Sequence, residues 1–439
     1  MRRAVLMICD GLRADLVQPE FCPLISALQA EGTSFLRHRA IFPSVTRTSA
    51  ASIATGCRPG GHGLHGNTMA LPEGEGFTVH NVGPPEFLST MRQVLGRTLR
   101  VPVLAERVKA LGDAVLYSNV SPGAAYFFDP EGSGYVYHRA GSYGPGRQAV
   151  AEPLVVSHDT AGDLAMTARF CAEALSPGQE AAAPPLAVLW LANPDKTMHG
   201  CALGSPTHRQ ALEAVEACVR QVAEAVAKLR DAGEEVLFLL GSDHGQETVR
   251  RVVPVERLMT ESGFKDGLDP AHLVVAPQGT SALVYAAETV PEERVDSLAD
   301  WLAGQDWCGT LWAGEALSEV GLAEEDGLRL AFSMAKSDEP NCHGVAGLSD
   351  AAVRFDEAEQ PPGLGQHGGT GAFESSPFLI AMGSDFAPDR RVRSETSLVD
   401  IAPTVLRHLG LSAEDLQGQA LQPIAQAAQP RASKIQNAT

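Results

Sequence analysis

Several short runs of consecutive apolar residues constrain the fold of this chain more than any other feature. These runs span residues 4–9, 114–117, 186–191, 236–240 and 378–382. A strand that is apolar at every position is buried on both faces, whereas a strand with one wet face alternates apolar and polar residues. Longer helical patterns separate the runs, as in a parallel sheet with crossover helices. The sequence therefore predicts an α/β fold: a doubly wound, mostly parallel sheet with helices on both faces.

The predicted helices span residues 23–30, 101–111, 210–232 and 397–409. A glycine lies just beyond each of them: Gly32, Gly112, Gly233 and Gly410. A left-handed residue commonly ends a helix, and glycine adopts that conformation without a steric penalty. We therefore expect each helix to end at its glycine.

Two regions depart from the regular alternation of strands and helices. Residues 68–162 are rich in Gly and Pro, and they contain the aromatic run Tyr126-Phe127-Phe128, which fits either the core or a stacking surface for a nucleobase. Residues 250–366 contain two strand-like runs (281–286 and 328–333) and an amphipathic helix (291–304). We therefore predict a catalytic core from residues 1–249 and 367–421, an inserted cap at 250–366, and a flexible polar tail at 422–439.

The charge balance limits the partners. The 439-residue chain carries a net charge of −19 at pH 7. Phosphate backbones bind to basic patches, so we expect no nucleic-acid polymer as a partner. A small anionic substrate stays compatible with this charge, because bound metal ions can reverse the local field. The oligomeric state is left open.

The N-terminal apolar run is the one segment that resembles a leader. It follows Arg2-Arg3 but stops at Asp10 after six residues, short of the 7–15 expected in a secretory signal. No stretch approaches the ~20 apolar residues of a membrane span. The eight cysteines are scattered without a CxxC pair, which favours buried thiols in a reducing compartment. The expected location is cytoplasmic, without a membrane partner.

Residues of metal-ligand type follow the predicted strands in four separate clusters. They are Asp10; Asp195 with His199; Asp243 with His244; and His367. Ligands gather at the carboxyl ends of strands in open α/β sheets. Taken alone, an Asp after a strand is more often a capping residue, and a lone His in a glycine-rich loop is usually exposed. Together, three Asp and three His can form two mixed N/O sites, which suits a pair of Zn²⁺ ions.

A candidate nucleophile lies between the first two clusters. Thr46 stands in Phe42-Pro43-Ser44-Val45-Thr46, just ahead of an apolar helix start. A hydroxyl held against two divalent cations is a nucleophile without a neighbouring base, which is chemistry suited to phosphoryl transfer.

The clusters match, in order and in local sequence, the pattern of the alkaline phosphatase superfamily. The chain specifically resembles its nucleotide pyrophosphatase/phosphodiesterase branch, over residues 4 to about 410. The matching motifs are the Asp-Gly after the first strand, the Pro-x-x-Thr region that runs to Ala54-Thr55-Gly56, the Asp-x-x-x-His pair, the Asp-His-Gly turn, the His-Gly loop and the segment at 397–406.

The resemblance implies a role for each matching residue. One metal would be held by Asp195, His199 and His367, and the other by Asp10, Asp243 and His244 with the Thr46 oxygen. Thr46 would be the nucleophile that forms a covalent phosphothreonine, and the amide of Asn67 would donate to a phosphoryl oxygen. The implied enzyme is a hydrolase of phosphoric esters, a phosphodiesterase, with two divalent ions, Zn²⁺ or Mn²⁺, and a small-molecule phosphate ester as substrate. A structural reading of Asn67, closing a turn, is the alternative.

Other reactions in the same superfamily stay open to different degrees. Sulfatases carry Cys or Ser where this chain has Thr46, and the Cys-x-Pro-x-Arg run is absent. Phosphomonoesterases bind an extra anionic oxygen with an Arg or further cations, and Arg47 could do this. Phosphonoacetate hydrolases share the threonine, both metal sites and the Asn, but they use a lysine pair, and Lys109 is the only lysine between Asn67 and Asp195. A metal-binding protein without turnover is disfavoured, because structural zinc sites lack a spare nucleophile.

Overall fold

A ten-stranded sheet forms the centre of the computed structural model, which describes residues 2–176, 183–354 and 361–423. Across the sheet the strands are β21 (Arg390–Val392), β2 (Thr33–Phe35), β20 (Leu379–Met382), β11 (Glu235–Gly241), β1 (Arg2–Cys9), β10 (Leu186–Leu191), β6 (Val115–Ser118), β7 (Tyr135–His138), β8 (Tyr143–Gly144) and β9 (Gln148–Ala149). All five predicted apolar runs are strands of this sheet, within one or two residues at each end.

The centre of the sheet is parallel, as predicted. Strands β11, β1, β10, β6 and β7 pair in parallel, in that order. Strand β20 runs antiparallel to both β11 and β2, and β8 and β9 close the opposite edge as antiparallel pairs. The apolar run at 378–382 identified this strand, but an apolar run does not encode direction, because two-sided burial has the same pattern in either orientation.

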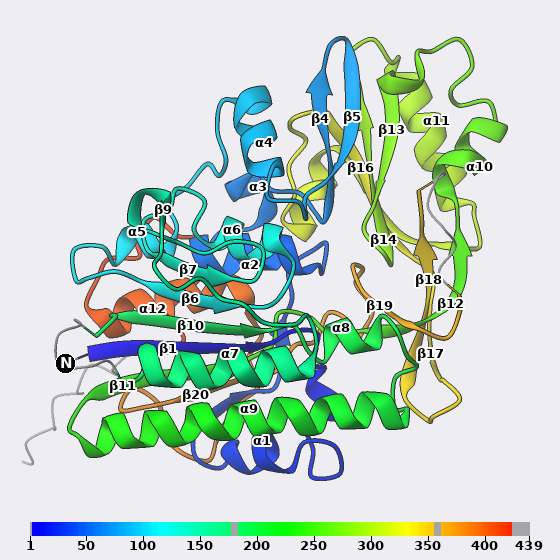
Figure 1. Ribbon diagram of the computed structural model, residues 1–439. Coiled ribbons are helices and arrows are strands. Elements are labelled where there is room, and N and C mark those ends of the chain that lie inside the picture. Colours follow the sequence, from blue (N-terminus) through cyan, green and yellow to red (C-terminus); the bar gives the residue numbers. More distant parts are fainter. Residues whose placement is uncertain (1, 177–182, 355–360, 424–439) are drawn as a thin grey trace, which may run out of the picture.

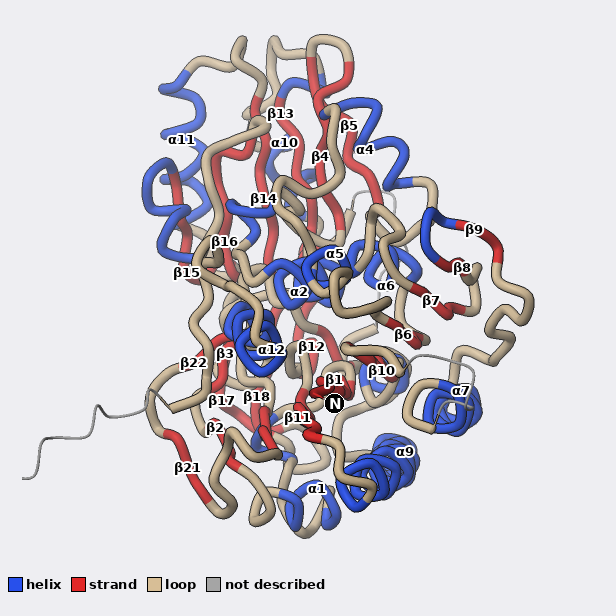
Figure 2. The backbone as a smooth tube through the Cα atoms, turned by 90° about the vertical axis from the view of Figure 1, so that its left-hand side faces the viewer, coloured by secondary structure: helices blue, strands red, loops and turns tan. Residues whose placement is uncertain are grey.

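Helices cover both faces of the sheet, and β1 shows why. Its residues Ala4, Leu6 and Ile8 belong to one hydrophobic cluster, whereas Val5, Met7 and Cys9 belong to another. Successive side chains of a strand point to opposite faces, so a strand buried on both sides serves two cores. Figure 2 shows the two helix layers, with α2 (Thr46–Thr55), α5 (Leu104–Arg107), α6 (Pro122–Phe128) and α12 (Ile401–Leu409) on one side and α1 (Pro23–Leu28), α7 (Thr160–Glu173) and α9 (Pro206–Asp231) on the other.

The helix predictions located the helices but not all their ends. Helix α9 begins at Pro206, four residues before the predicted start, because the Ser205 side chain accepts from the His208 N–H at 3.3 Å and caps it. The predicted helix at 101–111 is wrong in length: α5 is four residues long, and turns follow it. The predicted helix at 397–409 consists of a 3-10 turn, Leu398–Asp400, followed by α12.

The glycines past the helix ends have two different roles. Gly410 is left-handed, with φ of 77°, and ends α12 as predicted. Gly32 is not left-handed; a Cβ at this position would lie 2.5 Å from Met382 Cγ and 2.6 Å from the Ala381 carbonyl oxygen. Glycine is therefore required there by the close approach of β20, so the predicted reason for Gly32 was wrong.

The segment between the third and last ligand clusters builds two further four-stranded sheets (Figure 1, right). One consists of β13 (Leu273–Pro277), β14 (Ser281–Ala286), β16 (Leu328–Met334) and β15 (Cys308–Ala313), with α10 (Val255–Glu261) and α11 (Glu292–Ala303) beside it. The other consists of β17 (Lys336–Pro340), β18 (Ala346–Ala352), β12 (Glu247–Val253) and β19 (Gly365–Gln366). The predicted strands at 281–286 and 328–333 and the helix at 291–304 are confirmed as β14, β16 and α11.

Two structural observations bear on the predicted division into core and cap. The boundary at 249 falls inside β12, which joins the two parts. The hairpin of β4 (Thr68–Glu73) and β5 (Gly76–Asn81) comes from the irregular region at 68–162 and contacts β13 (Figure 1). A cap would therefore include this hairpin.

The remaining helices and strands are α3 (Pro59–His62), α4 (Phe87–Leu95), α8 (Asp195–Met198), β3 (His38–Arg39) and β22 (Thr396–Ser397). Among the described residues, none of the helices has the length and apolar character needed to cross a membrane. Except for Gln422 and Pro423, the predicted flexible tail lies outside the described residues.

The aromatic run Tyr126-Phe127-Phe128 belongs to the core. The three residues lie on α6 and are 5%, 0% and 2% exposed. They pack in the cluster on the α2 side of the sheet, so they are not available to stack on a ligand. Of the two readings that the sequence allows, the core reading is correct.

Candidate metal centre

Three neighbouring strands of the central sheet deliver the candidate ligands to one edge. Asp10 follows β1, the pair Asp195 and His199 follows β10, and the pair Asp243 and His244 follows β11. Because β10, β1 and β11 are adjacent and parallel, their carboxyl ends lie side by side. His367 joins them from the glycine-rich loop after β19. The structure thus brings together all six residues that the sequence singled out.

The six residues form two groups of three. In the first group, Asp195 Oδ1 lies 3.4 Å from His199 Nε2 and 3.5 Å from His367 Nε2. The spacing of four places Asp195 at the start of α8 and His199 at its C-cap, one helical turn apart. One Asp oxygen and two imidazole nitrogens at such distances converge on a point that one ion could occupy.

The second group is more deeply buried. His244 Nε2 lies 3.5 Å from Asp10 Oδ1 and 3.1 Å from Asp243 Oδ2. The other carboxylate oxygens have protein donors: Trp190 Nε1 donates to Asp10 Oδ2 and the Gly11 N–H to Asp243 Oδ1, both at 3.1 Å. The oxygens that face His244, Asp10 Oδ1 and Asp243 Oδ2, are buried without a hydrogen bond in the described chain. Buried oxygens left bare in this way fit a cation.

The three histidines present the same nitrogen to the centre. Nδ1 of His244, His367 and His199 lies 2.9, 2.8 and 3.1 Å from the carbonyl oxygens of Gly245, Ser44 and Gly365. Only a protonated Nδ1 can donate to a carbonyl, so these contacts set the tautomer and leave Nε2 with a free lone pair. A carbonyl partner on the far nitrogen is the usual support of a metal-binding histidine.

The electrostatics of the two groups also favour bound cations. Burial, and then the charges of Asp243 and Asp195, raise the pKa of Asp10 well above its usual range. Burial raises the pKa of Asp243 to about 7. Burial lowers the pKa of His367 to about 3, with His244 beside it, which keeps the imidazole neutral. Carboxylates this close cannot all stay ionised without added positive charge, and divalent ions would provide it. The donor set therefore fits two divalent cations.

The hydroxyl of Thr46 lies at the edge of this centre. Thr46 is the first residue of α2 and is 7% exposed, and its Oγ1 lies 3.1 Å from His244 Nε2. The extended backbone of Val45 leads into the helix, and the Thr46 side chain lies against the ligand residues of the second group. The nucleophile expected from the sequence is thus within reach of the atoms that would hold an ion.

Asn67 is oriented by its neighbour Arg47. The Arg47 N–H donates to Asn67 Oδ1 at 3.2 Å, and Arg47 Nη1 donates to the Asn67 carbonyl oxygen at 3.0 Å. The side-chain oxygen of Asn67 is therefore used as an acceptor, and its amide nitrogen has no hydrogen-bond partner in the described chain. This nitrogen is available as a donor to a ligand in the cavity, which Asn67 lines.

The guanidinium of Arg47 donates hydrogen bonds to two neighbouring residues. Besides its bond to Asn67, Arg47 Nε donates to Ser121 Oγ at 2.9 Å. Burial lowers the pKa of Arg47 to about 10, so the group stays protonated at neutral pH. Two of its donors are thus used by Asn67 and Ser121, and Arg47 itself lines the cavity described next.

A cavity of about 190 Å³ contains the centre. Thr46, Asn67 and four of the six ligand-type residues line it, and Asp243 and His244 lie behind them with no exposed surface. Ser121, His158 and Lys196 form another part of its wall. Two cationic side chains line the cavity, those of Arg47 and Lys196, and in the described part of the chain the Lys196 ammonium forms no ion pair.

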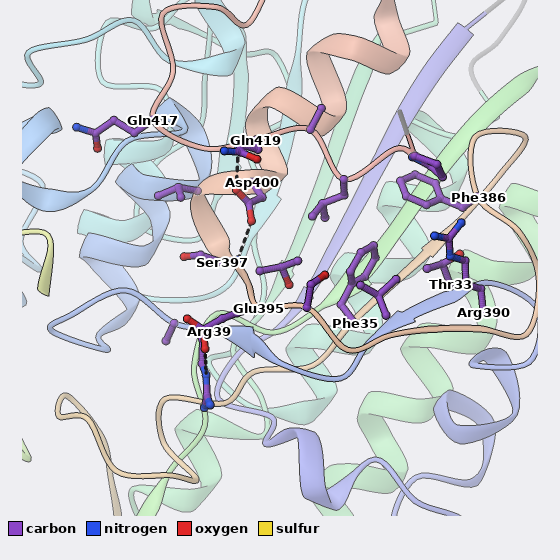
Figure 3. Close-up of a pocket in the computed structure, with 18 of the residues that line it drawn as sticks. Thr33, Phe35, Arg39, Phe386, Arg390, Glu395, Ser397, Asp400, Gln417 and Gln419 are labelled. Carbon is purple, nitrogen blue, oxygen red and sulfur yellow. Dashed lines mark hydrogen bonds and ion pairs between the residues drawn. The ribbon is translucent and has the colours of Figure 1, made fainter. Parts of the chain in front are cut away.

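A larger hollow of about 630 Å³ lies elsewhere, near β2 and β21 (Figure 3). Both of its carboxylates have partners: Asp400 accepts from the N–H groups of Ser397 and Gln419, and Glu395 lies 3.5 Å from Arg39. It is lined by none of the residues that the sequence predicted for the site.

Sequence reasoning missed several supporting residues. Gln246 Nε2 donates to Asp195 Oδ1, and Trp190 holds Asp10. Asp163 of α7 accepts from the N–H groups of Ala192 and Asn193 and from two Asn side chains, so it anchors the turn before Asp195. Gln246 could have been found from its place next to the Asp-His-Gly turn. Nothing local distinguishes Trp190 or Asp163 from ordinary strand and helix residues.

Comparisons with known proteins agree with this geometry. The family model described as type I phosphodiesterase / nucleotide pyrophosphatase matches residues 4–368. None of the curated protein sequences compared with the chain matches it.

Among solved structures, murine ectonucleotide pyrophosphatase/phosphodiesterase 5 is similar, with a TM-score of 0.65 and 17% identity over 95% of this chain and 98% of that one. An inactive variant of the same murine protein, in complex with AMP, has a TM-score of 0.64 and 17% identity, with the same coverage. The human counterpart has a TM-score of 0.63 and 15% identity over 95% of this chain and 97% of that one. At these identities the likeness shows the fold, which is the alkaline phosphatase-like α/β fold expected from the sequence.

Proposed function

Because the chain belongs to the type I phosphodiesterase / nucleotide pyrophosphatase family, we propose that it hydrolyses phosphate diesters through a covalent phosphothreonine at Thr46, beside two divalent metal ions. The family hydrolyses phosphoric ester bonds, and the chain is a hydrolase of this class. The observation that carries the finer proposal is the position of Thr46 Oγ1, 3.1 Å from His244 Nε2, at the edge of the two Asp/His groups.

The residues that would hold the ions are the two groups of three, with the Thr46 oxygen next to the second group. Zn²⁺ suits these nitrogen and carboxylate ligands, and Mn²⁺ is the second choice. When bound, the ions would supply positive charge that favours the Thr46 alkoxide and the oxygens of the transferred phosphoryl group.

The chain's own residues account for the remaining chemistry. Thr46 Oγ1 gives up its proton and forms a bond to phosphorus, while the ester P–O bond breaks and the alcohol leaves with a proton. Water then forms a bond to phosphorus, the Thr46 Oγ1–P bond breaks, and Thr46 recovers a proton. The Asn67 amide donates to a phosphoryl oxygen in both steps, and Arg47 holds the amide in place.

The use of the Arg47 donors supports a diesterase over a monoesterase. A monoester brings one more anionic oxygen, which needs its own cation. Arg47 lines the cavity, but its Nε and Nη1 already donate to Ser121 and Asn67, so fewer of its donors remain for that oxygen. A diester lacks the extra charge and suits the site as built.

Lys196 is the reason that the phosphonate alternative still needs a test. Phosphonoacetate hydrolases hold a carboxylate with a lysine pair, and Lys109, the one lysine between Asn67 and Asp195, instead contacts Asp113 and the Ser133 carbonyl oxygen. Lys196 lies just beyond that interval and lines the cavity, so a single lysine is available for an acidic substituent.

The test is a panel of substrates offered to the Zn²⁺-loaded protein. It contains a p-nitrophenyl nucleotide, a dinucleotide polyphosphate, p-nitrophenyl phosphate and phosphonoacetate. We expect the highest kcat/KM with a diester or a dinucleotide polyphosphate. Preferred hydrolysis of the monoester or of phosphonoacetate would replace the diesterase proposal with one of the two alternatives.

A further inference from the structure

Two buried carboxylates lie behind the candidate metal centre, and neither takes part in the chemistry above. Glu247 opens β12 and is 2% exposed, and Glu374 follows the His367 loop and is 0% exposed. One cation serves both: Lys336 Nζ contacts Glu374 Oε1 and lies 3.4 Å from Glu247 Oε2. Two buried charges of the same sign repel each other and lose hydration, so their burial depends on this lysine.

The two carboxylates hold the loop that carries His367. The Gly371 N–H donates to Glu374 Oε1 at 2.9 Å, and the Phe373 N–H donates to Glu247 Oε1 at 3.3 Å. A Cβ at Gly371 would lie 2.0 Å from Glu247 Oε1, so the loop backbone is packed directly on the carboxylate. The glycine at 371 is therefore required by this contact.

The same region also holds the turn that carries His244. The Gly245 N–H donates to the Glu374 carbonyl oxygen at 2.7 Å. Thr280 Oγ1 donates to Glu374 Oε2 and accepts from the Gly369 N–H at 2.8 Å. Glu374 is thus bonded both to the loop after His367 and to the turn after His244, and these histidines belong to different ligand groups.

Lys336 reaches this position from the inserted segment. It is the first residue of β17, opposite Ser349 of β18, and its Nζ also donates to Ser349 Oγ at 2.8 Å. Although burial alone would raise it, the Lys336 ammonium lowers the pKa of Glu374. Burial, and then the Glu374 charge, raise the pKa of Glu247 to about 7. A single ammonium therefore balances one carboxylate well and the second in part.

We propose that Lys336 is a positioning residue of the metal centre: its charge keeps Glu247 and Glu374 together behind the loops of His367 and His244, and so sets the ligand geometry. This inference rests on the two-metal centre of the proposed function. It assigns a task at the site to the inserted segment, from which Lys336 comes.

The experiment measures zinc affinity by competition with a chromogenic chelator, together with Tm, for the full-length protein and its variants. Lys336→Met should raise the dissociation constant for Zn²⁺ about 10–100-fold, as loss of a supporting residue around a metal site does. Lys336→Met/Glu247→Gln should recover most of that loss, because one of the two repelling charges is gone. Lys265→Met is the matched control: this half-buried lysine of the same segment pairs with Glu256 at 2.5 Å, away from both loops, and its loss should leave zinc affinity unchanged.

The outcomes separate this inference from the proposed function. A wild-type protein that binds no zinc would overturn the function and the inference together. Normal zinc binding by wild type and by Lys336→Met would overturn the inference alone, as would a fall in Tm without any change in affinity. If Lys336→Met does not fold, the double variant decides: it should fold and bind zinc as Glu247→Gln does, and an unfolded or zinc-poor double variant contradicts the charge argument.

Discussion

The imidazole rings of His244 and His367 stack face to face, with centroids 3.7 Å apart and planes within 14° of parallel. Each ring belongs to a different group of three ligand-type residues. Two ions bound by these groups would therefore be close neighbours, as in two-metal sites where both ions contact one phosphoryl group.

This arrangement predicts two metal equivalents per chain. Elemental analysis of the purified protein should approach two divalent ions, and His367→Ala and His244→Ala should each lose at least one. Chelation should abolish activity, and added Zn²⁺ should restore it. His80→Ala, in the β5 strand and outside both groups, should keep both ions. A fully active metal-free protein would disprove the two-metal proposal.

Thr46→Ala should abolish turnover, with a loss of at least about 10³-fold in kcat, because the attacking hydroxyl is removed. Metal content should stay near wild type, since the six Asp/His residues carry most of the affinity. Thr46→Ser should retain part of the activity. Thr48→Ala, on the same helix and also buried, is the control and should remain active. Near-normal rates in Thr46→Ala would make water the nucleophile.

Asn67→Ala should lower kcat/KM for diesters about 10²–10³-fold, the usual effect of removing one preorganised donor to a developing anion. Asn67→Asp keeps the size of the side chain but replaces the donor with an acceptor, so its loss should be at least as large. Both variants should bind two metal ions. Unchanged diester kinetics in Asn67→Ala would leave the residue with the turn-closing role alone.

Arg47→Gln should lower diester and monoester hydrolysis in the same proportion, by about tenfold or more, because Arg47 acts on both through its bonds to Asn67 and Ser121. The quantity to measure is the ratio of the two kcat/KM values. A loss confined to the monoester would show that Arg47 binds the extra anionic oxygen, contrary to the diesterase argument.

Acid should destabilise the fold through buried histidines away from the metal centre. The His62 side chain accepts from the Leu64 N–H at Nδ1, 3.1 Å away, so this nitrogen must be unprotonated. Burial lowers the pKa of His62 to about 3, below its unfolded value of about 6.5. Between these values the unfolded chain binds the proton and the folded chain does not, so stability falls as pH drops from 6.5 toward 3.

One such histidine lowers the free energy of unfolding by about 1.4 kcal/mol for each pH unit of acidification within that window. Denaturant unfolding of the metal-free protein at pH 7, 6 and 5 measures it. His62→Gln should reduce the slope by this amount, and the exposed His343→Gln should not. An identical slope in His62→Gln and wild type would show that His62 is not excluded from protonation.

The sequence by itself determined the strands and the residues at their ends. Continuous apolar runs identified the strands around Asp10, Asp195 and Asp243, because two-sided burial leaves a pattern in each strand separately. Parallel neighbours bring their carboxyl ends to one edge, so the meeting of these residues also followed from the pattern. The sequence context also made Thr46 a candidate nucleophile. The covalent phosphothreonine, the choice of Asn67 and the sorting of the ligands into two groups came from the resemblance to the family.

Only the tertiary structure decided the pairings between distant side chains. The antiparallel direction of β20 is one such case, because reversing a strand leaves its composition unchanged. The bonds of Arg47 to Asn67 and Ser121 are another, and so is the contact of Lys336 with Glu247 and Glu374. These contacts join residues up to 89 positions apart. Nothing in the local sequence around Glu374 or Lys336 marks either residue as a buried charged group. Their burial and charge balance arise from the path of the chain, because a charged group is stabilised by whatever partner the fold places beside it.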